Sequence, residues 1–491
     1  MSNLSELLPT GGGQNAVDFV ASGTLSSGQT VALKADGTVE AVQKTLSAPT
    51  ITTENAYSYS NVSSVAYDSV NNIFIFAYYG PSSYLALVAA SVDANGVFTF
   101  GTPVLYSTAF SRFAVACNDG KIMGVGGRFD SIFCIFSTAI SSGLSLNSIY
   151  LIFGPTPSGQ GYAAQDFYVE YNPVEDSFLA ASTDGWSGTS FVIGLSYNSA
   201  NNIGYGSPVY IDSGATNSAK NYKCVYDPDN QKMLVFWKQG SYPSSGASFF
   251  SYNATIITMS GTSVSVGNSV EISSGRIKEG PDSSYNKDIN KFISIYRMDN
   301  NEYATLRVVT VSGATISVGS EVSITAFGTE EYLLSVYDEL AEKTFITYLP
   351  SGAGQLFTLA SVNVSGTTPS LGLSSTYNLN GANYFTYAKT AYSTTDNKAF
   401  IFGQLSSQVT TYTVNQVSFN YTSFIGITAE AISSAATGPA NVYGGINEAQ
   451  TGLTIGSDYY VQDDGSISTT SSAVKIGQAI SATTINMMDL T

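Results

Sequence analysis

The stretch Val225-Tyr226-Asp227-Pro228-Asp229-Asn230-Gln231-Lys232-Met233-Leu234-Val235-Phe236-Trp237 sets the pattern for most of the chain. A tyrosine and an aspartate lead into a short polar turn, and a dense apolar run follows directly. The same arrangement recurs at six further places, which begin at Tyr67, Asn118, Tyr171, Tyr285, Tyr337 and Tyr392. The copies lie about 50 to 60 residues apart, a spacing typical of propellers and other repeat arrays. We count seven copies.

Each copy reads as four strands. The first leads into the Tyr-Asp turn, and the second is the apolar run after it, which must be covered on both faces. A third strand ends in a turn that contains Gly or Asn, and a fourth carries a recurring phrase such as Gly101-Thr102-Pro103-Val104. Proline in that phrase favours an edge strand, because it lacks an N–H group. We therefore predict an all-β protein with a seven-bladed β-propeller over residues 43–420.

The seventh copy lacks its fourth strand. Residues 45–53, upstream of the first Tyr-Asp turn, have the character of the missing outer strand. We predict that they complete the last blade and close the ring, which leaves only short, protected sheet edges.

The two flanks of the array share a phrase. Gly28 is followed eight residues later by Asp36-Gly37, and Gly456 is followed at the same distance by Asp464-Gly465. An Asp-Gly pair between alternating apolar residues is a strong hairpin signal. We predict that residues 11–42 and 421–491 are halves of one small β domain, preceded by an arm at 1–10; two unrelated hairpins are the alternative.

Charge and composition exclude several classes of function. The 491 residues carry a net charge of −17, which disfavours nucleic acid and anionic membranes as partners. The chain has no histidine, so Ser-His and Cys-His nucleophile pairs are absent. The three cysteines have no metal-ligand spacing and are predicted to be free, buried thiols. We expect no cofactor.

The N-terminus lacks the basic segment and apolar core of a signal peptide. The most apolar window, 74–92, is interrupted by Gly80-Pro81, so two strands explain it better than a membrane span. We expect a soluble protein that is made in a cytoplasm.

Many propellers are glycosidases, which need two carboxylates around one bond. The candidates are Asp184, Asp227, Glu331 and Asp338. An acid that recurs at one place in every repeat more simply holds a turn by hydrogen bonds to the backbone. Sialidases also need an arginine cluster, and only Arg128 and Arg297 fall where loops could reach the propeller mouth. An enzyme is therefore the weaker interpretation.

Two acidic turns could supply calcium ligands, residues 227–230 and Asp463-Asp464. Neither has the full ligand spacing of a known calcium loop. Solvated turns are the preferred interpretation, and we expect no metal.

The remaining candidate is a loop face. Loops from second to third strands and from fourth to first strands should gather on one side of the ring, and aromatic rings among small polar residues suit contact with carbohydrate or protein. The alternative is that these rings pack between blades. The loop-face candidates are Tyr84, Trp186, Tyr242, Tyr348, Tyr162, Tyr384 and Phe385, with Arg128 and Arg297.

The flanks resemble a known class of protein. Residues 10–19, 23–25 and 28–39 resemble the opening of virion structural proteins, notably fibre-like ones, of tailed bacteriophages. Residues 424–433, 451–461 and 474–483 resemble further segments of the same proteins. The resemblance covers about a fifth of the chain. It implies attachment to a virion and trimeric assembly, and it implies no catalytic residues.

From these observations we expect a virion structural protein whose split β domain mounts a propeller for contact with a host surface or with a neighbouring virion protein. Its expected partners are other virion proteins, further copies of itself, and a host glycan or protein. A virion-associated enzyme that degrades polysaccharide is the alternative from another class. A bacterial surface lectin is a third, and it would need an export route.

Overall fold

A computed structural model gives the structure of the chain. It describes residues 15–57, 62–79, 84–109, 112–118, 120–128, 131–140, 143–153, 165–183, 189–197, 203–211, 220–241, 249–273, 275–277, 281–299, 303–326, 333–348, 356–378, 388–405 and 408–487. Among these residues the secondary structure is β throughout, apart from one 3-10 turn at Tyr421–Ser423. The chain divides into two compact units, residues 48–416 and residues 1–47 with 417–491.

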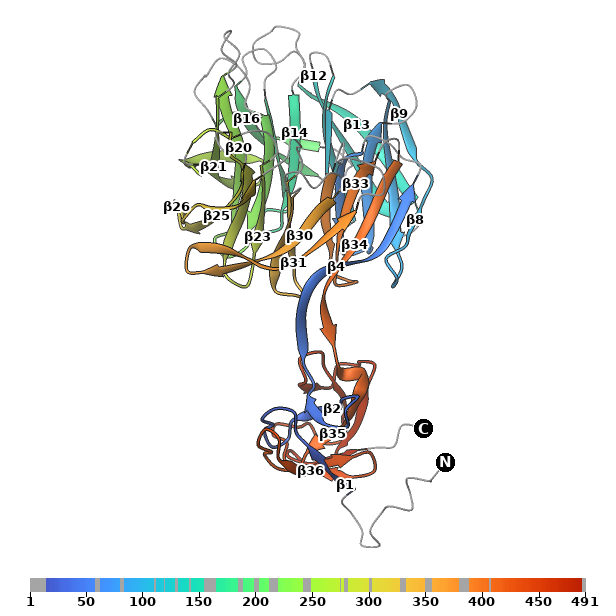
Figure 1. The fold of residues 1–491 in the computed structure, drawn as a ribbon. Helices are drawn as coiled ribbons and strands as arrows, with labels where there is room; N and C mark the ends of the chain where they lie inside the picture. Colours follow the sequence, from blue (N-terminus) through green and yellow to red (C-terminus); the bar gives the residue numbers. More distant parts are fainter. Residues whose placement is uncertain are drawn as a thin grey trace. The chain divides into compact units, whose positions relative to one another are not determined.

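The larger unit is a β-propeller (Figure 1), built of seven antiparallel sheets among the described residues. Within each blade the strands follow one another in chain order, except in the seventh. The blades are, in order, β5 Val62–Asp68, β6 Ile73–Tyr79, β7 Tyr84–Val92, β8 Phe98–Phe100 and β9 Val104–Ala109; β10 Arg112–Asn118, β11 Lys121–Arg128, β12 Ser131–Ile140 and β13 Gly143–Phe153; β14 Gln165–Asn172, β15 Ser177–Thr183, β16 Ser190–Tyr197, β17 Ile203–Tyr205 and β18 Val209–Tyr210; β19 Lys220–Asp227, β20 Lys232–Ser241, β21 Phe249–Ser260 and β22 Ser263–Glu271; β23 Asp282–Asn286, β24 Lys291–Arg297, β25 Tyr303–Ser312, β26 Thr315–Val318 and β27 Val322–Ala326; β28 Leu334–Asp338, β29 Lys343–Tyr348, β30 Leu356–Ser365 and β31 Thr368–Asn378; and β32 Ala388–Ser393, β33 Lys398–Leu405, β34 Gln408–Phe419 and β4 Lys44–Tyr57.

The first strands of the blades form the inner circuit of the ring. Each contacts the first strand of the next blade, from β5 through β10, β14, β19, β23 and β28 to β32, and β32 contacts β5. The circuit is therefore closed, and the predicted propeller fold is confirmed.

The seventh blade takes its outer strand from the other end of the array. In Figure 1 the blue β4 lies beside the orange β34. The Thr50 hydroxyl donates to the carbonyl of Asn415 at 3.1 Å, across this strand pair. The Tyr377 hydroxyl of the sixth blade accepts from the Ile51 N–H at 2.8 Å and donates to the Pro49 carbonyl at 3.2 Å. β4 is longer than the predicted strand at 45–53, and it is tied to two blades.

The second strand of each blade is apolar on both faces because both faces are covered. In β6, Ile73 and Ile75 pack with residues of the second blade. The alternate residues Phe74 and Phe76 pack with Phe402 and its neighbours in the seventh blade. Stacked sheets thus bury the whole strand, as its sequence predicts.

The outer strands differ from the prediction in one respect. Residues 101–103, which belong to the recurring phrase of the predicted fourth strand, interrupt that strand, because β8 and β9 pair with β7 on either side of them. The same break separates β17 from β18 and β26 from β27. Pro103 lies in the gap, where no ladder hydrogen bond requires its missing N–H.

The smaller unit contains two five-stranded sheets, which we call the first and second motifs. The first has the order β1-β36-β35-β2-β3, and the second has the order β37-β41-β40-β38-β39. Their strands are β1 Ala16–Val20, β2 Thr30–Leu33, β3 Val39–Ala41, β35 Phe424–Thr428 and β36 Thr437–Val442, then β37 Ile446–Asn447, β38 Asp458–Val461, β39 Ile467–Ser468, β40 Lys475–Ala479 and β41 Ile485–Met487.

The two motifs are the same structure built twice. Val31 pairs with Gly426 in the first, Tyr459 pairs with Gly477 in the second, and the register slips directly after each pair. The strands occur in the same sequence order in both. The propeller is inserted between the third and fourth strands of the first motif, whereas the second motif is continuous. The two predicted hairpins therefore belong to separate, equivalent sheets within one compact unit.

Candidate functional site

The Tyr-Asp turns are held by the side chain of the acid. The Asp227 carboxylate accepts hydrogen bonds from the N–H groups of Asp229 and Asn230, both at 3.1 Å, and from the Asn230 side chain at 2.9 Å. Asp68 bonds the N–H of Val70 in the same way. The residue that ends the turn has a left-handed backbone in all seven copies, at Asn72, Gly120, Asp176, Gln231, Asn290, Glu342 and Asn397. The predicted turn role of these acids is confirmed.

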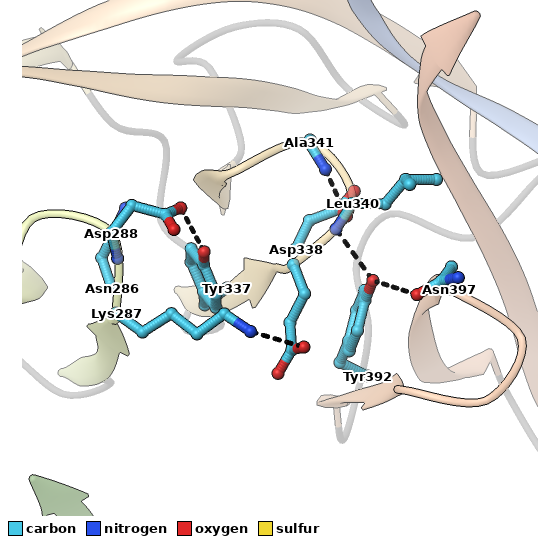
Figure 2. Close-up of polar contacts among 10 residues, drawn as sticks. Asn286, Lys287, Asp288, Tyr337, Asp338, Leu340, Ala341, Tyr392 and Asn397 are labelled. Carbon is cyan, nitrogen blue, oxygen red and sulfur yellow. Dashed lines mark hydrogen bonds and ion pairs between the residues drawn. The ribbon is translucent and has the colours of Figure 1, made fainter. Parts of the chain in front are cut away.

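The same turns join neighbouring blades. Figure 2 shows the Tyr337 hydroxyl of the sixth blade directed at Asp288 of the fifth, and the two are hydrogen-bonded. Lys287 forms an ion pair of 2.7 Å with Glu339 across the same boundary. Tyr392 of the seventh blade accepts from the Leu340 N–H at 3.0 Å. Burial raises the pKa of Tyr337, so its hydroxyl stays a proton donor. This face of the ring is a belt of inter-blade contacts.

A second group of polar residues lies on the inner circuit. We call Glu170 of β14, Lys223 of β19, Asp282 of β23 and Ser335 of β28 the inner-strand cluster. The Lys223 ammonium lies 3.0 Å from one Asp282 oxygen, and the Ser335 N–H donates to the other at 2.7 Å. Lys223 also lies 5.7 Å from the centre of the Tyr168 ring. The cluster links four consecutive blades.

The electrostatics of this cluster differ from those of an exposed ion pair. Burial raises the pKa of Glu170 to about 7, and Lys223 opposes part of that rise. Burial also disfavours the charge on Lys223, but Asp282 and its other neighbours more than offset this, so its pKa is raised. A carboxyl whose pKa is raised to about 7, near a lysine that is ion-paired with a second carboxylate, is an arrangement suited to acid–base chemistry, and equally a buried brace between blades.

Sequence reasoning missed this cluster because its members occur once each, on separate repeats. The available signal was the presence of charged residues on first strands in a chain with only 11% charged residues.

Two predicted loop residues are placed wrongly. Tyr348 is the last residue of β29 and is buried in the core between the fifth, sixth and seventh blades. Arg297 is the last residue of β24 and is also buried. Both strands run further than the sequence suggested, so these side chains lie inside the sheets. Neither contributes to a displayed face.

The other loop candidates are not tested by the structure. Trp186, Tyr242, Tyr162, Tyr384 and Phe385 lie outside the described residues, as do the carboxylate candidates Asp184 and Glu331. Tyr84 begins β7 and Arg128 ends β11, but their side chains also lie outside the description.

The two proposed calcium turns use their oxygens internally. Asp227 is occupied as described above, and Asp464 accepts from the Ser466 N–H at 2.8 Å. No cluster of three or more acidic or cysteine residues suited to a metal is found among the described residues. Cys134 and Cys224 are free and buried, and Cys117 is free and partly buried, which confirms the predicted free thiols.

No protein-family model matches the chain, and no curated protein matches it. Solved structures that resemble it include a Lactobacillus plantarum protein, with 13% identity and TM-score 0.46, covering 64% of this chain and 85% of its own. A putative 6-phosphogluconolactonase from Bacteroides uniformis has 10% identity and TM-score 0.47, with 73% and 95% covered. The polysaccharide lyase Uly1 has 9% identity and TM-score 0.46, with 75% and 99% covered.

None of these three is named as a virion protein, and at such identities and scores none carries an argument about function. Among the described residues, no helix is long and apolar enough to cross a membrane.

Proposed function

We propose that this chain is a fibre-like structural protein of a tailed-bacteriophage virion. In this proposal the smaller unit attaches to the particle and carries the propeller, which contacts a host surface or a neighbouring virion protein. The observation that carries the proposal is the location of the resemblance to virion proteins. Every phrase of it falls within residues 1–47 or 417–491, which are the smaller unit, and none falls in the propeller.

The architecture of the smaller unit supports a division of labour. Its second motif has the same strand order as the first without any insertion. The motif therefore does not need the propeller to complete its sheet, and the propeller is an addition to one copy. The two ends of the insertion are close together, since the Gln43 N–H donates to the Asn420 side chain at 2.8 Å, and insertion at such a site is well tolerated.

The proposed setting is a particle assembled inside a bacterium, with copies of this chain as partners and a trimer as the favoured state. The role requires no catalysis and no cofactor. The acidic chain, with a net charge of −17, suits contact with protein or neutral glycan better than contact with nucleic acid.

Immunogold labelling of phage particles from the lysate in which the chain is made tests this proposal. Antibodies raised against the full chain should label intact particles at a fixed position, and the chain should co-purify with them. A chain that remains entirely in the soluble fraction, with unlabelled particles, contradicts the proposal.

The inner-strand cluster favours a second candidate, a polysaccharide-degrading enzyme on the same particle. Glu170 would donate the proton and Asp282 would act as the paired carboxylate, since glycosidases divide these roles between two acids. Incubation of bacterial envelope polysaccharide with the full chain tests this directly. Depolymerisation that is lost in Glu170→Gln and kept in Asp36→Asn, a change in an exposed turn, would establish catalysis. Intact polysaccharide with the wild-type protein rules out this candidate.

A further inference from the structure

The two motifs can be compared at one equivalent turn, which we call the tip and which contains Gly28 in the first motif and Gly456 in the second. Gly28 and Gly456 occupy the same position, both with a left-handed backbone, at φ values of 76° and 82°. The Gly28 N–H donates to the Thr428 carbonyl at 3.0 Å, and the Gly456 N–H donates to the Ala479 carbonyl at 2.8 Å. Any difference between the tips therefore reflects what surrounds them.

The tip of the first motif is covered by the start of the second. The Gln450 side chain donates to the Gly28 carbonyl at 3.0 Å. The Asn447 side chain donates to the Thr428 carbonyl at 3.1 Å. A Cβ on Gly28 would overlap the Ala449 carbonyl oxygen. Strand β37 and the residues after it thus cover the tip of the first motif.

The equivalent tip of the second motif, around Gly456, is not covered by any described residue. Among the described residues, nothing lies within 4 Å of the position that a Cβ on Gly456 would take. Two isoleucines flank the opening, Ile455 with 68% of its surface exposed and Ile480 with 49%. The equivalent residues of the covered tip are Ser27 and Ala429, which are hydrogen-bonded to each other at 3.2 Å. Two exposed isoleucines beside an uncovered glycine indicate an interaction surface.

The strand equivalent to β37 is β1, the edge strand of the first motif. Val17 pairs with Ala440 as Asn447 pairs with Ile485, so Phe19 and Val20 correspond to Ala449 and Gln450. Most of β1 is exposed, and Val20 has 40% of its surface accessible. The chain therefore has an uncovered apolar tip on the second motif. It also has an exposed strand, β1, that is equivalent to the strand β37 covering the tip of the first motif.

We propose that a second copy of this chain places its β1 on the open tip of the second motif, with Val20 against Ile455, Gly456 and Ile480. The contact repeats between copies the packing that the two motifs already make within one chain. The contact is heterologous, because each copy contributes β1 to one neighbour and the tip of its second motif to another. Such contacts close into rings or continue as filaments. The inference rests on the two motifs alone and holds whether or not the chain belongs to a virion.

Disulfide trapping between full-length chains tests the contact. Val20→Cys and Ile455→Cys proteins are mixed and oxidised, and the expected product is a heterodimer of the two variants. Each variant alone and the wild-type chain, with its three native cysteines, are the controls and should yield no comparable product. Absence of the mixed product, or equal trapping in either variant alone, overturns the proposal.

Sedimentation of the wild-type chain at tens of micromolar should show self-association. Ile455→Asp should weaken it by about tenfold or more, because a charge would enter a desolvated apolar contact. Val70→Asp is the matched control, since Val70 is 63% exposed and aspartate stands at the equivalent turn position in the fourth blade. Ile480→Asp serves if Ile455→Asp fails to fold by circular dichroism. A monomeric wild type, or association that both isoleucine variants leave unchanged, contradicts the inference.

Discussion

The propeller and the smaller unit are both built from repeated structures. Side-chain hydrogen bonds maintain the repeat in the propeller, whereas backbone pairing maintains it in the smaller unit. In the propeller, each copy needs a side chain that accepts backbone hydrogen bonds, as Asp227 does from Asp229 and Asn230. Few residue types can do this, so the same letters recur in the sequence. In the smaller unit the repeat lies in backbone pairing and in glycines, and the apolar residues are free to differ.

Equivalent positions in the two motifs make this difference concrete. Val31 corresponds to Tyr459, and Ala32 corresponds to Tyr460, yet the pairing register is unchanged. What is kept is Gly426 and Gly477, where a Cβ would overlap the carbonyl oxygen of Asn441 or Asn486. A repeat held by side chains is visible in the sequence, whereas one held by the backbone is largely hidden.

The largest expected effect comes from those glycines. Gly477→Ala should destabilise the smaller unit by about 4 kcal/mol or more, because the new methyl group meets backbone that cannot move away. Gly37→Ala is the control, since its Cβ would meet open space and only its left-handed backbone would cost about 1 kcal/mol. Urea denaturation measures both. Equal destabilisation by the two changes would show that close backbone approach does not hold the motif.

The turn acids should rank next. Asp227→Ala should destabilise the propeller by about 3 kcal/mol, because the buried Asp227 carboxylate accepts three hydrogen bonds that the variant loses together. Asp36→Ala removes a similar bond, from the Thr38 N–H, at an exposed turn of the smaller unit, and should cost less than about 1 kcal/mol. Thermal unfolding of the two variants compares the regions directly.

The inner-strand cluster predicts a pH dependence. Glu170 has an ordinary pKa of 4.5 when unfolded and about 7 when folded. Between these values the folded state holds a proton that the unfolded state has lost, so this group lowers stability as pH rises through the window. Glu170→Gln should flatten that slope, and at pH 8 it should be more stable than the wild type by about 2 kcal/mol after allowance for solvent screening. A slope unchanged between pH 5 and pH 8 would refute the assignment.

The smallest effect is expected at the inter-blade belt. Tyr337→Phe removes one hydrogen bond to Asp288 and should cost about 1 kcal/mol, which is typical of a single hydrogen bond at a partly exposed site. A double-mutant cycle with Asp288→Ala isolates the pairwise contribution. Additive costs would mean that the two side chains are not coupled.

These contrasts explain what the sequence could and could not predict. The sequence predicts the turns and the second strands covered on both faces, because their residue types recur in each copy. It also predicts that residues near Thr50 close the ring, because the seventh copy lacks a fourth strand. The equivalence of the motifs did not follow, because few positions beyond the Gly and Asp-Gly ones are shared in sequence. The inner-strand cluster did not follow either, since Glu170, Lys223 and Asp282 come from three blades and are brought together only by the closed circuit.

Errors in the predicted site have an equally physical origin. Tyr348 and Arg297 are the last residues of their strands, at positions where a loop was expected, and the stacked sheets bury them. Strand ends are the least certain feature of any pattern, because the last residue of a strand and the first of a loop differ only in their neighbours.

A density map of the full chain at side-chain resolution tests the central claim, that seven sheets form a ring that β4 completes. We expect seven blades around one axis, with residues 44–57 as the outer strand of the last, beside β34. A different number of blades, an open array, or residues 44–57 paired outside the ring would contradict the account.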